Sequence, residues 1–447
     1  MSSSNTKKII PSLSSFLLLE GLFNSEPSGM ALQGLAVSLQ GDGVDAPENY
    51  RILWREVVSK QEFVQYPTVG NALQDYWLEK FLDNPNVLHR KAEVVDFPQI
   101  GRDLVKVYAG ELEVFRKILA LDWQGLTRKF AVGQEVPSLE SSQGWPSSSV
   151  LPKWEKDRRD LKKEILSSKK DSVVLTESIC KYFRHHGFGL FARHRAFRWR
   201  PTVAGRLGHL EAVAFPDPIL LADLKGYDEA RRAFLDNLEG FVSGKQANNV
   251  LIYGERGTGK SSTVKASLNE YADRGLRLVE LSPLDALDVS STLKVLRPRP
   301  ERFILFLDDL SFNKDDVRYR GLKALLEGSV EPLPSNVILV ATSNRRHLVP
   351  ETFAEREGGV RSEGEIHEVD AVEEKLSLSD RFGLVVSFYS PDQATYLAIV
   401  RHLAGRAGLH VPIPELESGA VLWALQNNGR SGRAAAQYIR HLSQGPS

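Results

Sequence analysis

The chain has 447 residues, and its 57 lysines and arginines equal its 57 aspartates and glutamates, so its formal net charge is zero. This length predicts two or three domains, and the neutrality argues against a protein that simply coats a polyanion, although a local basic patch is still compatible with it. Cys180 is the only cysteine, which excludes an intrachain disulfide, disfavours a thiolate zinc site and fits a reducing cytoplasm.

Residues 1–135 are predicted to form an N-terminal helical domain. The run "FLLLEGLF" follows Lys7 and Lys8 as in a short signal peptide, but Glu20 interrupts it and it is too short to span a bilayer. We interpret it as the start of a buried helix, and we expect a soluble cytoplasmic protein without membrane contact. Apolar residues of "LVKVYAGELEVFRKIL" recur at helical spacing and predict a packed stripe: Leu104, Tyr108, Leu112, Phe115 and Leu119.

Residues 136–152 are rich in serine, proline and glycine, which predicts a linker or an exposed loop. Residues 153–215 are predicted to contain a charged helix followed by a basic aromatic connector. The helix, "KWEKDRRDLKKEILSSKK", is expected to present its charges to solvent.

The basic aromatic stretch, residues 180–210, contains no aspartate or glutamate. Its arginines and histidines alternate with Phe188, Phe191, Phe197 and Trp199. Basic side chains could follow a phosphate backbone while aromatic rings stack on unpaired bases, which is one interpretation. In the other, the aromatics pack between domains and the arginines pair with acids elsewhere, such as those of "RSEGEIHEVDAVEEK".

Short apolar runs alternate with helical stretches from about residue 216 onward. This alternation predicts an α/β domain over residues 216–390, with a parallel sheet flanked by helices. Nearly continuous apolar runs are typical of strands buried on both faces. Five strands are predicted, at 250–253, 276–281, 303–307, 337–341 and 384–388. Residues 391–447 are predicted to form a small helical C-terminal piece.

A glycine-rich loop follows the first of these strands. The residues Gly254 to Ser261, "GERGTGKS", fit the pattern G-x-x-x-x-G-K-[ST] between a strand and a helix. Glycines let backbone N–H groups converge on phosphate oxygens, and the helix N-terminus adds a favourable dipole. The predicted nucleotide-binding residues of this loop are Gly254, Glu255, Arg256, Gly257, Thr258, Gly259, Lys260, Ser261 and Ser262. Lys260 is expected to reach the β- and γ-phosphates of ATP, and Ser261 to ligate Mg²⁺.

Two aspartates end the strand of "FILFLDDLSF". Ligands collect at the carboxyl ends of strands in open α/β sheets, so both acids are placed where they could act on a bound nucleotide. Asp308 is predicted to bind Mg²⁺, and Asp309 to orient or deprotonate the attacking water.

These motifs resemble those of the AAA+ ATPases, and residues from about 200 to 442 are most similar to the bacterial AAA+ family catalogued as domain of unknown function 815. The similar stretches include "NNVLIYGERGTGKSS", "FILFLDDLSF", "LKALLEG", "NVILVATSNRRHLVPE", "LSLSDRFGL" and "GRSGRAAAQYI". The resemblance implies a P-loop NTPase fold with a five-stranded parallel sheet, a small C-terminal helical lid and, here, a mostly helical N-terminal domain.

The resemblance also implies roles for single residues. Asn344 corresponds to sensor 1, Arg381 to the arginine finger that a neighbouring subunit supplies, and Arg433 to sensor 2, with Arg430 as a second candidate. Residues that line the adenine pocket in the family correspond to Leu224, Gly226 and Tyr227. Plain alternatives exist: an asparagine that starts a turn, an arginine paired with the adjacent Asp380, and apolar residues that belong to the core.

The sequence departs from the usual AAA+ pattern at Asp309, where most members carry glutamate. Aspartate is one methylene shorter, and a misplacement of about 1 Å can cost about 100-fold in rate. We therefore expect slow ATP hydrolysis, with complete loss of turnover as an alternative.

Three functions are compatible with this sequence. The first is an oligomeric protein-remodelling or chaperone-like ATPase, such as a hexameric ring of identical subunits, whose N-terminal domain selects a protein client. The second is a nucleic-acid-associated ATPase, such as a helicase loader, that uses residues 180–210. The third is an ATP-gated scaffold with little turnover. The sequence names neither the client nor the number of subunits.

Overall fold

A computed structural model describes residues 16–24, 27–61, 68–139, 153–201, 208–282, 288–311, 322, 326, 332–344, 381–427 and 429–444. The chain divides into two compact units, Met1–Arg193 and His194–Ser447. Each unit has its own hydrophobic core, so each is described by itself.

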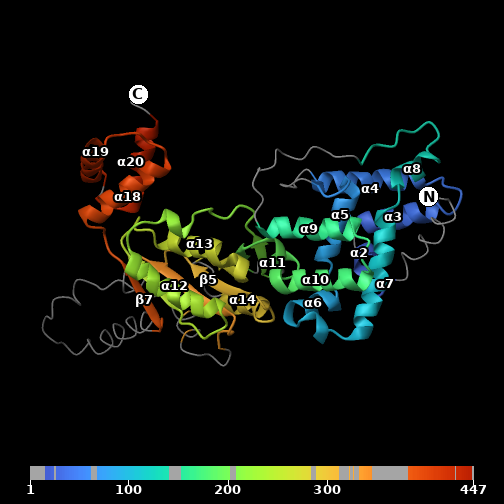
Figure 1. The fold of residues 1–447 in the computed structure, drawn as a ribbon, viewed down its shortest axis with the longest axis horizontal. Coiled ribbons are helices and arrows are strands. Elements are labelled where there is room, and N and C mark those ends of the chain that lie inside the picture. The colour runs from blue at the N-terminus through green and yellow to red at the C-terminus, as the bar shows by residue number, and fades with distance from the viewer. Residues whose placement is uncertain are drawn as a thin grey trace, which may run out of the picture. The chain divides into compact units, whose positions relative to one another are not determined.

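The first unit is helical in its described residues (Figure 1). Its helices are α2 Glu20–Asn24, α3 Pro27–Ser38, α4 Ala46–Gln61, α5 Ala72–Asp83, α6 Val87–Val94, α7 Arg102–Leu119, α8 Trp123–Arg128, α9 Lys153–Ser167, α10 Ser172–His186 and α11 Leu190–Arg193, with a short 3₁₀ turn η2 at Phe97–Gln99. The chain predicted to start a buried helix contributes α2, on which Leu22 and Phe23 are buried.

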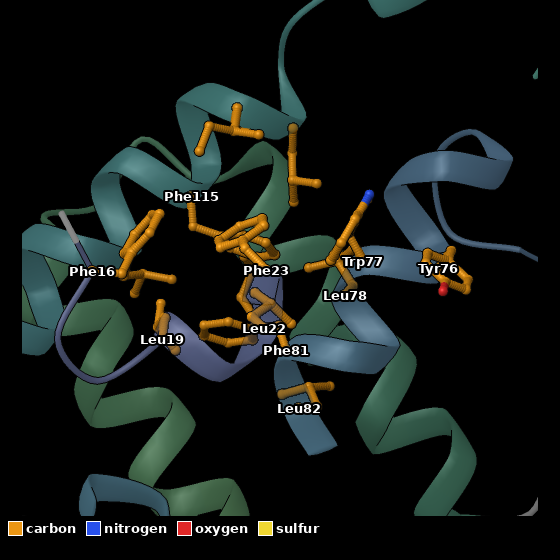
Figure 2. Close-up of a cluster of buried hydrophobic side chains, with 14 of the residues drawn as sticks. Phe16, Leu19, Leu22, Phe23, Tyr76, Trp77, Leu78, Phe81, Leu82 and Phe115 are labelled. Carbon is orange, nitrogen blue, oxygen red and sulfur yellow. The ribbon is translucent and has the colours of Figure 1, made fainter. Parts of the chain in front are cut away.

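Aromatic side chains fill the core of this unit (Figure 2). The ring centroid of Phe23 lies 5.3 Å from that of Trp77, and Phe81 stacks on Phe115 at 4.8 Å. The predicted stripe on α7 is confirmed, because its residues Tyr108, Leu112, Phe115 and Leu119 are buried and Leu104 packs beside them. Large apolar side chains from helices distant in sequence therefore stabilise one common core.

The charges of α9 do not all face solvent, so this part of the prediction is wrong. Helix α5 presents three acids four residues apart on one face, Asp75, Glu79 and Asp83. Arg158 and Lys162 of α9 are 1% and 3% exposed and pair with these acids. A charge that loses water needs a partner, and α5 supplies the partners at matching spacing.

The second unit contains a seven-stranded mixed sheet. Its strands are β1 Ala196–Arg200, β2 His209–Ala212, β3 Val250–Gly254, β4 Leu276–Glu280, β5 Arg302–Leu307, β6 Val337–Ser343 and β7 Leu384–Phe388. Their order across the sheet is β2-β1-β4-β5-β6-β3-β7, and each neighbouring pair is parallel except β1 and β2. All five predicted strands are present, but the prediction that the sheet has only five is wrong.

The two additional strands come from the predicted basic connector. In "AFRWR" the side chains alternate, with Phe197 and Trp199 buried and Arg198 and Arg200 exposed. This is the two-residue period of a strand, but its exposed positions carry charge and its length is only 5 residues. Because arginines occupy the exposed positions, the sequence pattern indicated a basic connector and not a strand.

The contacts of this segment favour the packing interpretation over nucleic-acid contact. Phe188, Phe191, Phe197 and Trp199 are all buried. The arginines of its described residues form ion pairs within their own unit: Arg184–Asp96, Arg193–Asp83, Arg195–Asp273, Arg198–Glu280 and Arg200–Glu211. Buried rings cannot stack on bases in this conformation.

Helices pack on the sheet and form a separate cluster after it (Figure 1). Helices α12 Asp228–Val242 and α13 Lys260–Tyr271 share a core with the central strands, and α14 Val289–Leu296 also buries an apolar face. Short 3₁₀ turns occur at η3 Leu221–Asp223 and η4 Ala272–Arg274. Helices α18 Gln393–Arg406, α19 Ile413–Gln426 and α20 Gly432–Ser443 form a small three-helix cluster with a core of its own.

Helices long and apolar enough to cross a bilayer are absent from the described part of the chain.

The paired charges of α5 and α9 generate a stability prediction. Lys162→Met leaves Asp75, whose side chain is 4% exposed, without its cationic partner, and we expect a loss of about 3–5 kcal/mol in the free energy of unfolding. Chemical denaturation followed by circular dichroism measures it. The matched control is Lys163→Met, because Lys163 is exposed and its pair with Asp160 is worth less than about 1 kcal/mol. Equal denaturation midpoints for the two variants would contradict the prediction.

Candidate functional site

The loop between β3 and α13 has three glycines with positive φ: Gly254 at 146°, Gly257 at 78° and Gly259 at 94°. A Cβ on Gly254 would lie 1.9 Å from the carbonyl oxygen of Phe388 on the neighbouring strand β7. A Cβ on Gly257 would lie 2.9 Å from Cβ of Arg433, whereas one on Gly259 would meet nothing within 4 Å. The first two glycines therefore permit close packing of the chain, while the third faces open space.

Lys260 is the first residue of α13 and is 8% exposed. Its Nζ donates hydrogen bonds of 2.8 Å to the carbonyl oxygens of Gly254 and Glu255, and one of 3.2 Å to Oδ1 of Asn344. Burial lowers the pKa of Lys260, while the nearby Asp309 and Asp308 act in the opposite direction. The ammonium group is thus held inside the loop by acceptors that an anionic ligand could replace.

Ser261 and Thr342 both donate to the same carboxylate oxygen. The two hydroxyl groups each lie 2.6 Å from Oδ1 of Asp308. Ser261 lies on the first turn of α13, Asp308 directly follows β5, and Thr342 lies on β6. Three elements therefore meet at one oxygen atom.

Asp309 has a left-handed backbone, with φ at 54°. This region is uncommon for a residue other than glycine, although aspartate and asparagine adopt it more readily than most. Its N–H donates to Oγ1 of Thr342 at 2.9 Å, and its Oδ1 accepts from Nδ2 of Asn344 at 2.5 Å. Asn344 therefore bridges Lys260 and Asp309.

The segment before α12 contains the other described non-glycine residue with positive φ, Tyr227, at 59°. Arg231 holds this turn by donating to the carbonyl oxygens of Leu224, at 2.8 Å, and Gly226. The Tyr227 ring stacks on Phe388 with centroids 5.0 Å apart, and burial raises the pKa of Tyr227 to about 12. Phe388, the last residue of β7, thus contacts both the glycine loop and the predicted base-binding segment.

The three-helix cluster reaches this loop through α20. The N–H of Arg433 donates to the carbonyl oxygen of Gly257 at 3.2 Å. On α18, Thr395 limits the space at Gly226, where a Cβ would lie 2.7 Å from its Cγ2. Both predicted segments are therefore in contact with the C-terminal helices.

The structure brings five of the predicted residues into one hydrogen-bonded group: Lys260, Ser261, Asp308, Asp309 and Asn344. Thr258 and Glu255 shape the loop, since the Thr258 hydroxyl donates to the Glu255 carbonyl oxygen at 2.8 Å and the Ser390 hydroxyl donates to the Glu255 carboxylate.

Gly254 and Glu255 also contact this group, because their carbonyl oxygens accept hydrogen bonds from Lys260. Arg256 is exposed, Ser262 is partly buried, and Arg381 is exposed in the turn before β7. The acidic stretch 361–375 and Asp380 lie outside the described residues.

Thr342 is the site residue that sequence reasoning missed. It lies on an apolar strand, "VILVATS", and is 1% exposed. Its place in the site follows from the register of β5 and β6. This register pairs Leu307 with Ala341 and so places position 342 beside Asp308. Strand neighbours are not known before the sheet order is known.

The donor set is suited to a hard cation. Described residues contain no cluster of three or more histidine, cysteine or acidic side chains that could hold a metal by themselves. Magnesium in nucleotide sites needs fewer protein ligands, because it is held by one or two carboxylates together with phosphate oxygens and waters. The Ser261 hydroxyl and the partly exposed Asp308 carboxylate, 2.6 Å apart, supply such oxygens.

A glycine loop between a strand and a helix, with an acid pair at the end of a nearby parallel strand, is the arrangement of the P-loop class of nucleotide-binding proteins. The model of the family described as "Protein of unknown function (DUF815)" matches residues 192–445, which is more than half of the chain. The chain belongs to this family.

Similarity to curated and solved proteins is partial. The chain is 39% identical over 69 residues to the replication factor C large subunit of Staphylothermus marinus, which covers 15% of this chain and 16% of that protein. Solved structures of the Holliday junction branch migration motor RuvB of Thermotoga maritima and of a RuvB mutant are 15% and 16% identical, with TM-scores of 0.35 and 0.36. In both cases the alignment covers 51% of this chain and 65% of the RuvB chain.

The glycines of the loop generate a second prediction. Gly254→Ala forces a methyl group against the Phe388 carbonyl oxygen, and we expect a loss of about 3 kcal/mol or more because β3 and β7 must separate. Gly259→Ala meets no neighbouring atom and has only its positive φ to oppose it, so it should cost about 1–2 kcal/mol. Chemical denaturation of both variants tests the difference, and equal losses would contradict it.

Proposed function

We propose that this protein binds and hydrolyses ATP with Mg²⁺. One observation carries the proposal: Lys260, Ser261, Asp308, Asp309 and Asn344, from one helix N-terminus and the ends of the parallel strands β5 and β6, form a single hydrogen-bonded group that Thr342 completes. These are the residue types that phosphoryl transfer requires, namely a phosphate-binding cation, a hydroxyl–carboxylate pair for the metal and an acid for the attacking water.

The loop and Lys260 would bind the triphosphate. Gly259 leaves open space at the helix N-terminus, where N–H groups and the helix dipole favour an anion. Phosphate oxygens are stronger acceptors for an ammonium group than the two loop carbonyls that now hold Lys260. The lysine would exchange these partners for the β- and γ-phosphates.

Ser261 and Asp308 would hold the metal. Bound Mg²⁺ would neutralise charge on the phosphate oxygens, and the protein's part is to keep both oxygen ligands in place. Their 2.6 Å hydrogen bond and the second bond from Thr342 give the Asp308 carboxylate a fixed orientation.

Asp309 would accept a proton from the attacking water, and Asn344 would orient that water or the γ-phosphate. Both must first exchange the contact that they make with each other. The short Asp309 side chain restricts how closely a water can be held, which supports slow turnover.

Leu224, Gly226 and Tyr227 would line the adenine pocket. Arg231 fixes the carbonyl groups of this turn, and Phe388 supports the Tyr227 ring beside the glycine loop. Arg433 would respond to nucleotide, because its N–H donates to the carbonyl oxygen of Gly257 in the loop.

A neighbouring copy of the chain would complete the site with Arg381, which is exposed in the turn before β7. An arginine supplied in this way stabilises charge on the transferring phosphoryl group and can contribute about 10³–10⁵ in rate. The working assembly would be a homo-oligomer such as a hexameric ring in the cytoplasm.

In biological terms we favour protein remodelling, in which the helical first unit selects a protein client. That unit has an extensive core of its own. The nucleic-acid alternative depends on residues 180–210, and in the described part of this stretch Phe188, Phe191, Phe197 and Trp199 are buried and the arginines are ion-paired. A scaffold with little turnover stays compatible with the short Asp309.

Removal of Lys260 tests nucleotide binding. Lys260→Ala should abolish detectable ATP binding in titration calorimetry, because the buried cation of the loop is lost. Lys265→Ala is the matched control: it lies on the same helix, is 41% exposed, and should bind ATP as the native protein does. Normal ATP affinity of Lys260→Ala would refute the proposed site.

Mixed oligomers test whether sites are shared. Arg381→Ala and Asp309→Asn subunits should each be inactive alone, and their mixture should regain part of the ATPase rate because some interfaces combine a native Arg381 with a native Asp309. Asparagine is used because it tolerates the left-handed backbone at 309. A mixture no faster than either variant alone would count against a shared site.

A further inference from the structure

Thr342 makes hydrogen bonds to three consecutive residues of the segment that follows β5. Its hydroxyl donates to Oδ1 of Asp308 at 2.6 Å and accepts the N–H of Asp309 at 2.9 Å. Its carbonyl oxygen accepts the N–H of Leu310 at 2.7 Å. The residue is 1% exposed, so water cannot take over any of these contacts easily.

These bonds form where regular pairing between β5 and β6 ends. The parallel register runs from Phe303 opposite Val337 to Leu307 opposite Ala341. Two residues after Leu307, Asp309 adopts the left-handed region at φ 54°, and its N–H, which would otherwise lose its partner, donates to the Thr342 hydroxyl. A hydroxyl at position 342 therefore makes this turn compatible with a buried strand end.

We propose that Thr342 is a positioning residue for the magnesium–nucleotide site, acting through Asp308 and Asp309. This inference rests on the proposed function. The one hydroxyl proton fixes the Asp308 carboxylate, and the hydroxyl lone pair fixes the backbone from which the Asp309 side chain extends. One side chain thus sets the relative placement of the metal-binding acid and the water-binding acid.

A residue that only stabilises the fold would behave differently from a positioning residue. Loss of stability weakens all nucleotide binding, with or without metal. Loss of positioning affects the part of binding that needs Mg²⁺, because residues that orient a metal ligand typically contribute about 10–100-fold in metal affinity. The metal-dependent part of binding is therefore the informative measurement.

The experiment compares Thr342→Val, which keeps the shape and loses the hydroxyl, with Thr342→Ser, which keeps the hydroxyl. Binding of a non-hydrolysable ATP analogue to the full-length protein is measured by titration calorimetry over a range of Mg²⁺ concentrations and in EDTA. We expect Thr342→Val to need about 10–100-fold more Mg²⁺ for half-maximal tightening, with little change in EDTA. Thr342→Ser should follow the native protein.

Thr292→Val is the matched control, because Thr292 is fully buried on α14 and its hydroxyl donates to a backbone carbonyl, that of Asp288, at 3.1 Å. It should leave the Mg²⁺ dependence unchanged. Should Thr342→Val not fold, Thr342→Cys, whose thiol is a weak donor, replaces it with the same expectation.

Two results would overturn the inference. One is a Thr342→Val protein with the Mg²⁺ dependence of the native protein. The other is an equal loss of binding with and without Mg²⁺, which assigns Thr342 a structural role. A native protein that binds no nucleotide under any condition would instead contradict the proposed function, and the inference with it.

Discussion

The site depends on the common edge at which the parallel strands β3, β5 and β6 end. Their registers pair Tyr253 with Ser343 and Leu307 with Ala341, so the chain leaves all three strands at nearly the same level. Residues more than eighty positions apart, such as Lys260 and Asn344, thereby come within 3.2 Å of each other. A shift of one residue in either register would reverse the faces to which these side chains point, and the hydrogen-bonded group could not form.

Backbone strain in the described chain is concentrated beside this edge. Of the non-glycine residues there, Tyr227 and Asp309 have positive φ, and each is secured by one buried polar side chain, Arg231 or Thr342. A left-handed residue costs about 1–3 kcal/mol and persists only where its surroundings determine it. Both turns carry residues of the proposed nucleotide site, so the supporting contacts maintain geometry that the local sequence would not adopt by itself.

Sequence patterns predicted which segments form helices and strands, but not which of these segments lie next to one another in the fold. The strands at β3, β4, β5, β6 and β7 were found because apolar runs between helices are typical of a buried parallel sheet. Strand β1 was missed because Arg198 and Arg200 hide its alternation, and the buried pairing of Lys162 was missed because its partner Asp75 lies 87 residues away. Thr342 has no motif of its own, since its role arises from a strand register. The functions of the predicted site residues, those of Arg381 and Arg433 included, stay predictions.

The unusual Asp309 follows from the same geometry. The AAA+ pattern that this sequence resembles usually has a glutamate here, and a change of side-chain length by itself would only displace the carboxylate. In this chain the residue also has φ at 54° and accepts a hydrogen bond from Asn344. Aspartate can stabilise a left-handed backbone through local hydrogen bonds, whereas glutamate has no comparable preference for that region. The short acid and the turn are therefore suited to each other, and the placement of the carboxylate is determined by the backbone and by Thr342 more than by side-chain reach.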